Sequence, residues 1–222
     1  MPELAWHFLR DDWRLQYPPC SVVVAGGTYT AQGPLELCKN GMHASLQALD
    51  ALRYAPGTVV CRVLLGGEIV YGHDSFDKDK VCARTRTVLW LAEAGAVLHE
   101  FACRVGEQAL ARSADAGYPP DFRSTDAIKI KRAWLRGEVS DADVDAAWKR
   151  AWDAVWHTTW DVADSATWTM AQAAAARAAK DAVRIAAWAT ARSTPWAGIW
   201  GASSTELEQM LLALAPAEGT PA

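Results

Sequence analysis

The chain has 222 residues, 51% of them hydrophobic and 22% charged, which is enough apolar material for a core and excludes a wholly disordered protein. The net charge of -4 lacks the basic excess that is typical of nucleic-acid-binding proteins. The five cysteines are odd in number and form no C-x-x-C pair, so the sequence favours reduced thiols and predicts neither disulfides nor a metal site.

The first residues have neither the basic nor the apolar region of a secretory signal. Charged residues interrupt the apolar and alanine-rich stretches before they reach the length of a membrane span. We therefore expect a cytoplasmic protein with no membrane partner and no nucleic-acid partner.

The first hundred residues predict short strands and turns around one helix. Residues 5–9 and 22–25 are short apolar runs, and 58–65 is the strongest predicted strand because it is rich in β-branched side chains. Ser45 is predicted to cap a helix that ends near Tyr54. The buried face of that helix would carry one of two sets, either Leu46, Leu49 and Leu52 or Leu46, Ala48 and Ala51.

A glycine pair follows the strongest predicted strand. Gly66 and Gly67 lead into residues 68–71, which predicts either a hairpin or a bulged pair of strands. Residues 85–91 predict a further strand, one face of which carries Arg86, Val88 and Trp90.

The second half of the chain has a helical pattern. The period becomes helical from Glu93 to about Arg112, and the two prolines within residues 117–121 predict a boundary. We therefore predict an α+β domain over residues 1–116, built on a small mixed or antiparallel sheet. Residues 117–222 are predicted to form an all-helical region rich in tryptophan and alanine.

Capping residues predict where individual helices of this region begin and end. Ser124 or Thr125 is expected to begin a helix that Gly137 ends, and Ser140 is expected to begin the next. Residues 203–206 match a capping box and predict the start of a short C-terminal helix.

Tryptophan is in excess, with 12 residues against 4 phenylalanines and 5 tyrosines. Eight of them lie between positions 148 and 200 at spacings that are multiples of four, which places successive rings along a slowly winding ridge of a helix. The ridge can be core, a homo-oligomeric interface, or a stacking platform for bases or sugars, although acidic residues near it argue against nucleic acid. As an interface it would present Trp148, Trp152, Trp156 and Trp160.

The densest polar cluster is the segment 38–45, just before the predicted helix. Near a helix N-terminus, His43 and Ser45 would be suited to bind an anionic group such as a phosphate or a pyrophosphate. The structural alternatives are a histidine that bonds the adjacent turn and a serine that only caps the helix.

Several segments together resemble a family of uncharacterised phage and prophage proteins. These segments are L-C-x-x-G-x-H at 37–43, the following helix, C-R-V-x-L-x-G at 61–67 aligned on Cys61, and the pair Asp79-Lys80, joined to an Ala/Trp-rich tail. The resemblance implies a viral accessory origin and no established activity.

The order of histidine, serine, helix and strand is also similar to the NAD-cleaving core of ADP-ribosyltransferase-like proteins. This resemblance implies that His7 supplies the first motif, His43 and Ser45 the second, and Glu68 the third. His7 and His43 would then hold NAD, and His43, Ser45 and Glu68 would form the catalytic set.

Three hypotheses about function follow. The leading one is a non-catalytic, phage-encoded accessory protein that binds a host protein in the bacterial cytoplasm, as in counter-defence, without a cofactor. The first alternative is an ADP-ribosyltransferase-like enzyme that uses NAD. The second is a structural homo-oligomer.

Overall fold

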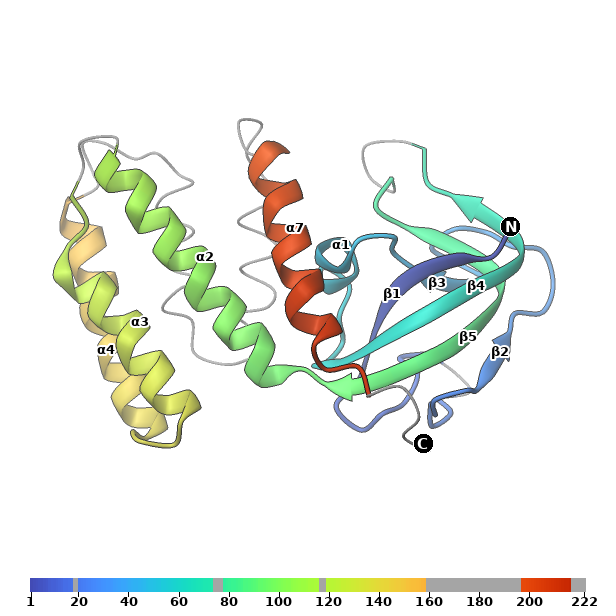
Figure 1. The fold of residues 1–222 in the computed structure, drawn as a ribbon, viewed down its shortest axis with the longest axis horizontal. Coiled ribbons are helices and arrows are strands. Elements are labelled where there is room, and N and C mark those ends of the chain that lie inside the picture. Colours follow the sequence, from blue (N-terminus) through green and yellow to red (C-terminus); the bar gives the residue numbers. More distant parts are fainter. Residues whose placement is uncertain (18–19, 74–77, 116–118, 159–196, 217–222) are drawn as a thin grey trace. The chain divides into compact units, whose positions relative to one another are not determined.

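The computed structural model describes residues 1–17, 20–73, 78–115, 119–158 and 197–216 (Figure 1). The chain divides into two compact units, one of Met1–Gly95 with Ser204–Ala222 and one of Ala96–Ser203. The domain boundary predicted between residues 116 and 117 lies within residues 116–118, which are outside the described residues, so it stays a prediction.

The first unit contains the strands, and the α+β class predicted from the sequence is confirmed. Its elements are β1 (Glu3–Leu9), β2 (Thr28–Thr30), β3 (Met42–Ala44), α1 (Ala48–Leu52), β4 (Val59–Tyr71) and β5 (Val81–Glu93). The helices that follow are α2 (Gly95–Asp115), α3 (Phe122–Leu135), α4 (Asp141–Thr158) and α7 (Ala197–Leu212).

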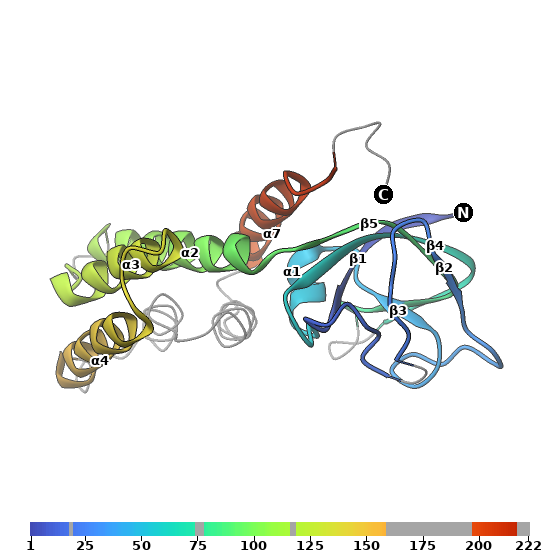
Figure 2. The same ribbon diagram turned by 90° about the horizontal axis from the view of Figure 1, so that it is seen from below.

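The five strands form one antiparallel sheet in the order β1-β4-β5-β2, and β3 pairs with another part of β5. The far side of β1 meets the end of β3, because the Trp6 and Ser45 backbones exchange two hydrogen bonds of 2.8 and 3.0 Å. The sheet therefore curls, as Figure 2 shows, and the curl separates an inner face from an outer one.

A bulge in β4 makes this curl possible. The register of β4 against β5 shifts between Gly66 and Ile69, and the chain continues through the glycine pair as a single strand. Of the two sequence predictions for this segment, the bulged pair is confirmed and the hairpin is wrong. Gly67 has a φ of 73°, and a Cβ there would lie 2.8 Å from the Cβ of Arg84, so only glycine fits.

The inner face of the sheet holds the main hydrophobic core. Every second residue along a strand points to this face, and residues directly opposite each other on paired strands point to the same face. Cys61 thus shares the inner face with His7 of β1 and Leu91 of β5. The buried members are Ala5, Leu9, Val23, Ala44, Val59, Cys61, Val63, Leu65, Val81, Ala83 and Val88.

The helix α1 is shorter than predicted and begins later. Its N-cap is Gln47, whose own side chain makes no capping hydrogen bond, so the prediction that Ser45 caps this helix is wrong. Ser45 is instead drawn into the backbone pairing with β1. Leu46 is exposed, so both predicted buried faces are wrong at that position, whereas Leu49 and Leu52 are fully buried.

The second unit consists of helices, and local capping explains their ends. Asp121 caps α3 by accepting the Arg123 N–H, so the predicted caps Ser124 and Thr125 are wrong. Gly137 ends this helix at a φ of 73°, as predicted. Ser140 begins α4 by exchanging hydrogen bonds with Asp143, also as predicted.

The predicted capping box at 203–206 lies inside α7, so that prediction is wrong. The segment is helical on both sides, and Ser203 and Ser204 are buried. No helix among the described residues is long and apolar enough to cross a membrane.

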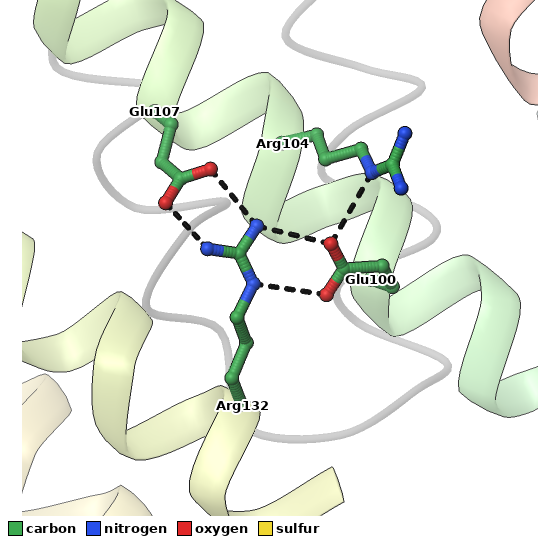
Figure 3. Close-up of polar contacts among 4 residues, drawn as sticks. All are labelled: Glu100, Arg104, Glu107 and Arg132. Carbon is green, nitrogen blue, oxygen red and sulfur yellow. Dashed lines mark hydrogen bonds and ion pairs between the residues drawn. The ribbon is translucent and has the colours of Figure 1, made fainter.

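An arginine joins α2 to α3 in the second unit (Figure 3). Arg132 of α3 lies between two carboxylates of α2, with Nε 2.9 Å from Glu100 and Nη2 2.8 Å from Glu107. Arg104 also bonds Glu100, at 3.2 Å. Burial alone would raise the pKa of Glu100, but the hydrogen bonds from Arg132 and Arg104 together lower it, so the carboxylate stays ionised.

Candidate functional site

The most unusual side chain of the sheet unit is Arg86, an arginine on the inner face of the curled sheet. It lies in the middle of β5 opposite Leu65 on one side and Tyr29 on the other, and both of these neighbours pack in the core. Only 3% of Arg86 is exposed. The strand pairing on both sides therefore holds a guanidinium inside an apolar interior.

The buried guanidinium has few partners. Nη1 donates to the backbone carbonyl of His43 at 2.7 Å, and that carbonyl is its only hydrogen-bond acceptor among the described residues. Nε is buried and unpartnered, and no described carboxylate forms an ion pair with the group. Burial lowers the pKa of Arg86 to about 10, so the group still carries its charge at neutral pH.

The polar groups near Arg86 are uncharged. Burial first, and the charge of Arg86 second, lower the pKa of His7 well below its ordinary value, so this imidazole is neutral at pH 7. Burial raises the pKa of Cys61, the strand partner of His7, to about 12, so the thiol stays protonated. The Tyr29 hydroxyl donates to the Val22 carbonyl at 3.3 Å.

The predicted residue His43 lies next to this group, but its imidazole serves the preceding turn. Nε2 accepts the Cys38 N–H at 2.9 Å, where Cys38 has a φ of 66°. A neutral imidazole has one acceptor nitrogen, and here the turn occupies it. Burial lowers the pKa of His43, a backbone hydrogen bond to Gly41 opposes this, and nearby Arg86 lowers it further.

The predicted anion site at the start of α1 is filled by the chain itself. The Ala48 N–H donates to Oε1 of Glu208 in α7 at 3.0 Å. A carboxylate at a helix N-terminus is favourable because the free N–H groups there carry partial positive charge. Ser45, only 2% exposed, contributes its backbone to the sheet.

Glu68, predicted as the catalytic carboxylate, lies on the other side of the glycine bulge. Its Oε2 pairs with Nη2 of Arg84 at 2.9 Å, and 61% of its side chain is exposed. None of the contacts among the described residues joins Glu68 to His7 or His43. The structure thus brings His7 and the His43 backbone to Arg86 and places Glu68 on a separate, exposed ion pair.

The tryptophan ridge is only partly described. Trp148 packs against the small core between α3 and α4, which contains Ala127, Ala147 and Ala151. Trp152 and Trp156 belong to α4, but their side chains, like the whole of Trp160, lie outside the described residues.

Sequence reasoning missed Arg86, although a signal was present. Residue 86 falls on the same predicted face as Val88, and an arginine on an apolar strand face is a buried-charge candidate. Only the pairing of β5 with β4 and β2 shows that this face of β5 points into the core. In the described part of the chain, no group of three or more His, Cys, Asp or Glu side chains lies close enough together to hold a metal ion.

The similarity of the chain to known proteins lies in the segment that contains the sheet. No curated protein and no solved structure matches the chain. Residues 4–100 match a protein family described as "Domain of unknown function (DUF7666)". The matched segment runs from β1 into the start of α2 and contains His7, His43 and Arg86, so the chain is similar to that family over the sheet that holds the candidate site.

Proposed function

We propose that the sheet unit binds a small anionic molecule, whose charged group pairs with the guanidinium of Arg86. The observation that carries the proposal is the unbalanced buried charge of this arginine. Burying an ionised group without an opposite charge costs several kcal/mol, because the apolar interior does not supply the favourable interactions that water makes with the charge. A bound anion supplies the missing charge.

The direction of the free hydrogen-bond donors supports the same proposal. Nη1 is used by the His43 carbonyl, which fixes the guanidinium in one orientation. On the edge that Nε shares with Nη2, the Nε–H is buried and has no hydrogen-bond partner among the described residues. Two parallel N–H groups on this edge match a carboxylate or a phosphate, each of which offers two oxygens.

Thermal unfolding of the full-length protein tests the proposal. Acetate, inorganic phosphate, pyrophosphate and NAD would each be added at a concentration series with the ionic strength held constant. A ligand present at ten times its Kd stabilises the folded state by about 1.4 kcal/mol, which raises the Tm of a protein of this size by roughly 3–6 °C. We expect at least one of these anions to do so.

Two matched variants locate the effect. Arg86→Met removes the charge and keeps an unbranched apolar stem, whereas Arg84→Met removes a nearby arginine that already bonds Glu68 and the Ala31 carbonyl. The stabilisation by the anion should disappear in the first variant and persist in the second. The proposal is wrong if none of the anions stabilises the wild type, or if Arg86→Met responds as the wild type does.

The other hypotheses keep their own tests. ADP-ribosyltransferase activity stays a prediction. Incubation with labelled NAD and host lysate would show transfer of the label if it is correct, and intact NAD with no label transferred would contradict it. Recovery of a host protein in a pull-down would test the accessory role, provided that Trp→Ala changes on the ridge abolish recovery and leave the chain folded.

A further inference from the structure

We propose that the group bound at Arg86 carries a single negative charge, as a carboxylate or a phosphodiester does, and that a doubly charged phosphate ester is disfavoured. This inference rests on the proposed function and deepens it by naming the class of ligand. It follows from counting the charges on the inner face of the sheet.

One residue from each strand around the guanidinium enters the count. β1 contributes the neutral imidazole of His7, and β4 contributes the protonated thiol of Cys61. β2 contributes the hydroxyl of Tyr29, which donates to a backbone carbonyl, and β3 contributes the carbonyl of His43. Arg86 is therefore the single charge in this group.

Three other cationic side chains of the sheet unit have contacts of their own. Arg84 donates to the Ala31 carbonyl at 3.1 Å and pairs with Glu68. Arg62 lies against the opposite face of the sheet, with its guanidinium carbon 4.4 Å from the Trp6 ring centroid. Lys80 lies over the Tyr54 ring, with Nζ 4.6 Å from the centroid. None of the hydrogen bonds and ion pairs of the described residues joins these three side chains to Arg86, although the charge of Lys80 acts on the His43 imidazole and lowers its pKa.

A single positive charge in an apolar interior matches one negative charge. The core around it is made of valine, leucine and alanine side chains, so charges there are screened far less than in water. The second charge of a phosphate monoester would remain unbalanced, and it would have to be neutralised by a proton before the group was buried.

Titration of the arginine side-chain signals by nuclear magnetic resonance provides the test. The full-length protein labelled with ¹⁵N would be titrated at pH 7.5 with acetate, dimethyl phosphate and methyl phosphate. The Nε–H signal of Arg86 would be assigned by its absence from the Arg86→Met variant. The Arg84 signal serves as the control within the same sample.

We expect acetate or dimethyl phosphate to shift the Arg86 signal saturably, with a midpoint at least tenfold lower than that of methyl phosphate. The stronger of the two monoanions identifies a carboxylate or a phosphodiester as the source. For methyl phosphate, whose second pKa is about 6, the midpoint should fall when the pH is lowered to 5.5.

The possible failures are distinct. If methyl phosphate at pH 7.5 saturates the Arg86 signal at an equal or lower concentration than both monoanions, the inference is overturned while the proposed function stands. If no anion shifts the Arg86 signal more than the Arg84 signal, the proposed function itself fails.

Discussion

Arg86 is a buried charge with few partners among the described residues. Its side chain is 3% exposed, and its charge is balanced by no carboxylate among the described residues. Charged groups in such positions are commonly retained for function at a cost in folding free energy. Whether replacing this residue raises or lowers the free energy of unfolding therefore distinguishes a functional from a structural role.

We predict that Arg86→Met raises the free energy of unfolding of the ligand-free protein by about 1–3 kcal/mol. The physical reason is that the variant removes an unbalanced buried charge and loses one hydrogen bond to His43. Urea denaturation measures the change. Arg84→Met is the control, and it should be destabilising because Arg84 bonds two backbone carbonyls and Glu68. A clear loss of stability in Arg86→Met would instead show that the arginine only supports the fold.

A second buried titratable group, His99, lies in the helical unit. Its ring meets Trp134 edge-on with 5.1 Å between centroids, its Nδ1 is unpartnered, and only 3% of the residue is exposed. Burial first, and the charge of Lys131 second, lower the pKa of His99 to about 4. The folded protein therefore holds this imidazole neutral where the unfolded chain would protonate it.

The helical unit should consequently lose stability as the pH falls. The unfolded state binds the proton near pH 6.5 and the folded state only near pH 4. The free energy of unfolding is therefore unaffected by the titration of His99 above pH 6.5 and decreases as the pH falls from 6.5 to 4. His99→Phe keeps the aromatic contact and has no proton to bind. Between pH 7.5 and pH 5 we therefore expect its free energy of unfolding to fall by about 2 kcal/mol less than that of the wild type. Hydrogen exchange of α2 and α3 measures this, with the exposed His73→Gln as the control. Equal pH dependence in His99→Phe and wild type would contradict the assignment.

At the scale of elements, the glycine bulge of β4 allows the sheet to curl. Gly67 has positive φ, and it faces the Cβ of Arg84 across the pair of strands. Gly26 has nearly the same φ, 76° against 73°, but nothing lies within 4 Å of the position that a Cβ would take. An alanine at Gly26 therefore tests the cost of the backbone conformation alone, whereas an alanine at Gly67 adds the cost of a steric clash.

We predict that Gly26→Ala costs about 1–2 kcal/mol, the price of a left-handed conformation alone. Gly67→Ala should cost at least about 1 kcal/mol more, because its Cβ would lie 2.8 Å from that of Arg84 and the strands must separate. Both would be measured by urea denaturation. Equal losses in the two variants would mean that the strands yield freely and that the bulge does not constrain the curl.

At the scale of the molecule, the C-terminal segment Ser204–Ala222 belongs with the sheet, although more than a hundred residues of helical unit precede it. Leu207 and Leu211 of α7 are fully buried, and Glu208 accepts the first free N–H of α1. The carboxylate also lies near enough to Arg62 to oppose the effect of burial on that guanidinium, whose pKa is lowered. The start of α1 thus depends on the end of the chain.

We expect Glu208→Ala to destabilise α1 by about 1 kcal/mol, the usual value of a helix cap. Glu208→Gln keeps an acceptor oxygen and should recover part of the loss. Hydrogen exchange of the Ala48 amide reports the effect directly, since that N–H loses its acceptor only in the alanine variant. The role of Glu208 as a cap is excluded if the Ala48 amide is equally protected in the wild type and both variants.

The sequence alone determined the class of the fold and those helix ends that depend on neighbouring residues. Alternation predicts β5 and a helical period predicts α2, while Gly137 and Ser140 act within a few positions of the helix ends that they form. Such features depend on local conformation, which a linear pattern records.

Only the tertiary structure decided where the candidate site lies. Glu208 fills the start of α1 from a position 160 residues away, and the curl that encloses Arg86 requires β1 to reach the end of β3. The site predicted from the sequence assumed that His43, Ser45 and a nearby helix terminus act together. The His43 imidazole bonds the adjacent turn at Cys38, five residues away, which is the structural alternative stated for it from the sequence. The contact of the His43 carbonyl with Arg86, 43 residues away, depends on the pairing of β3 with β5, and no local spacing encodes it.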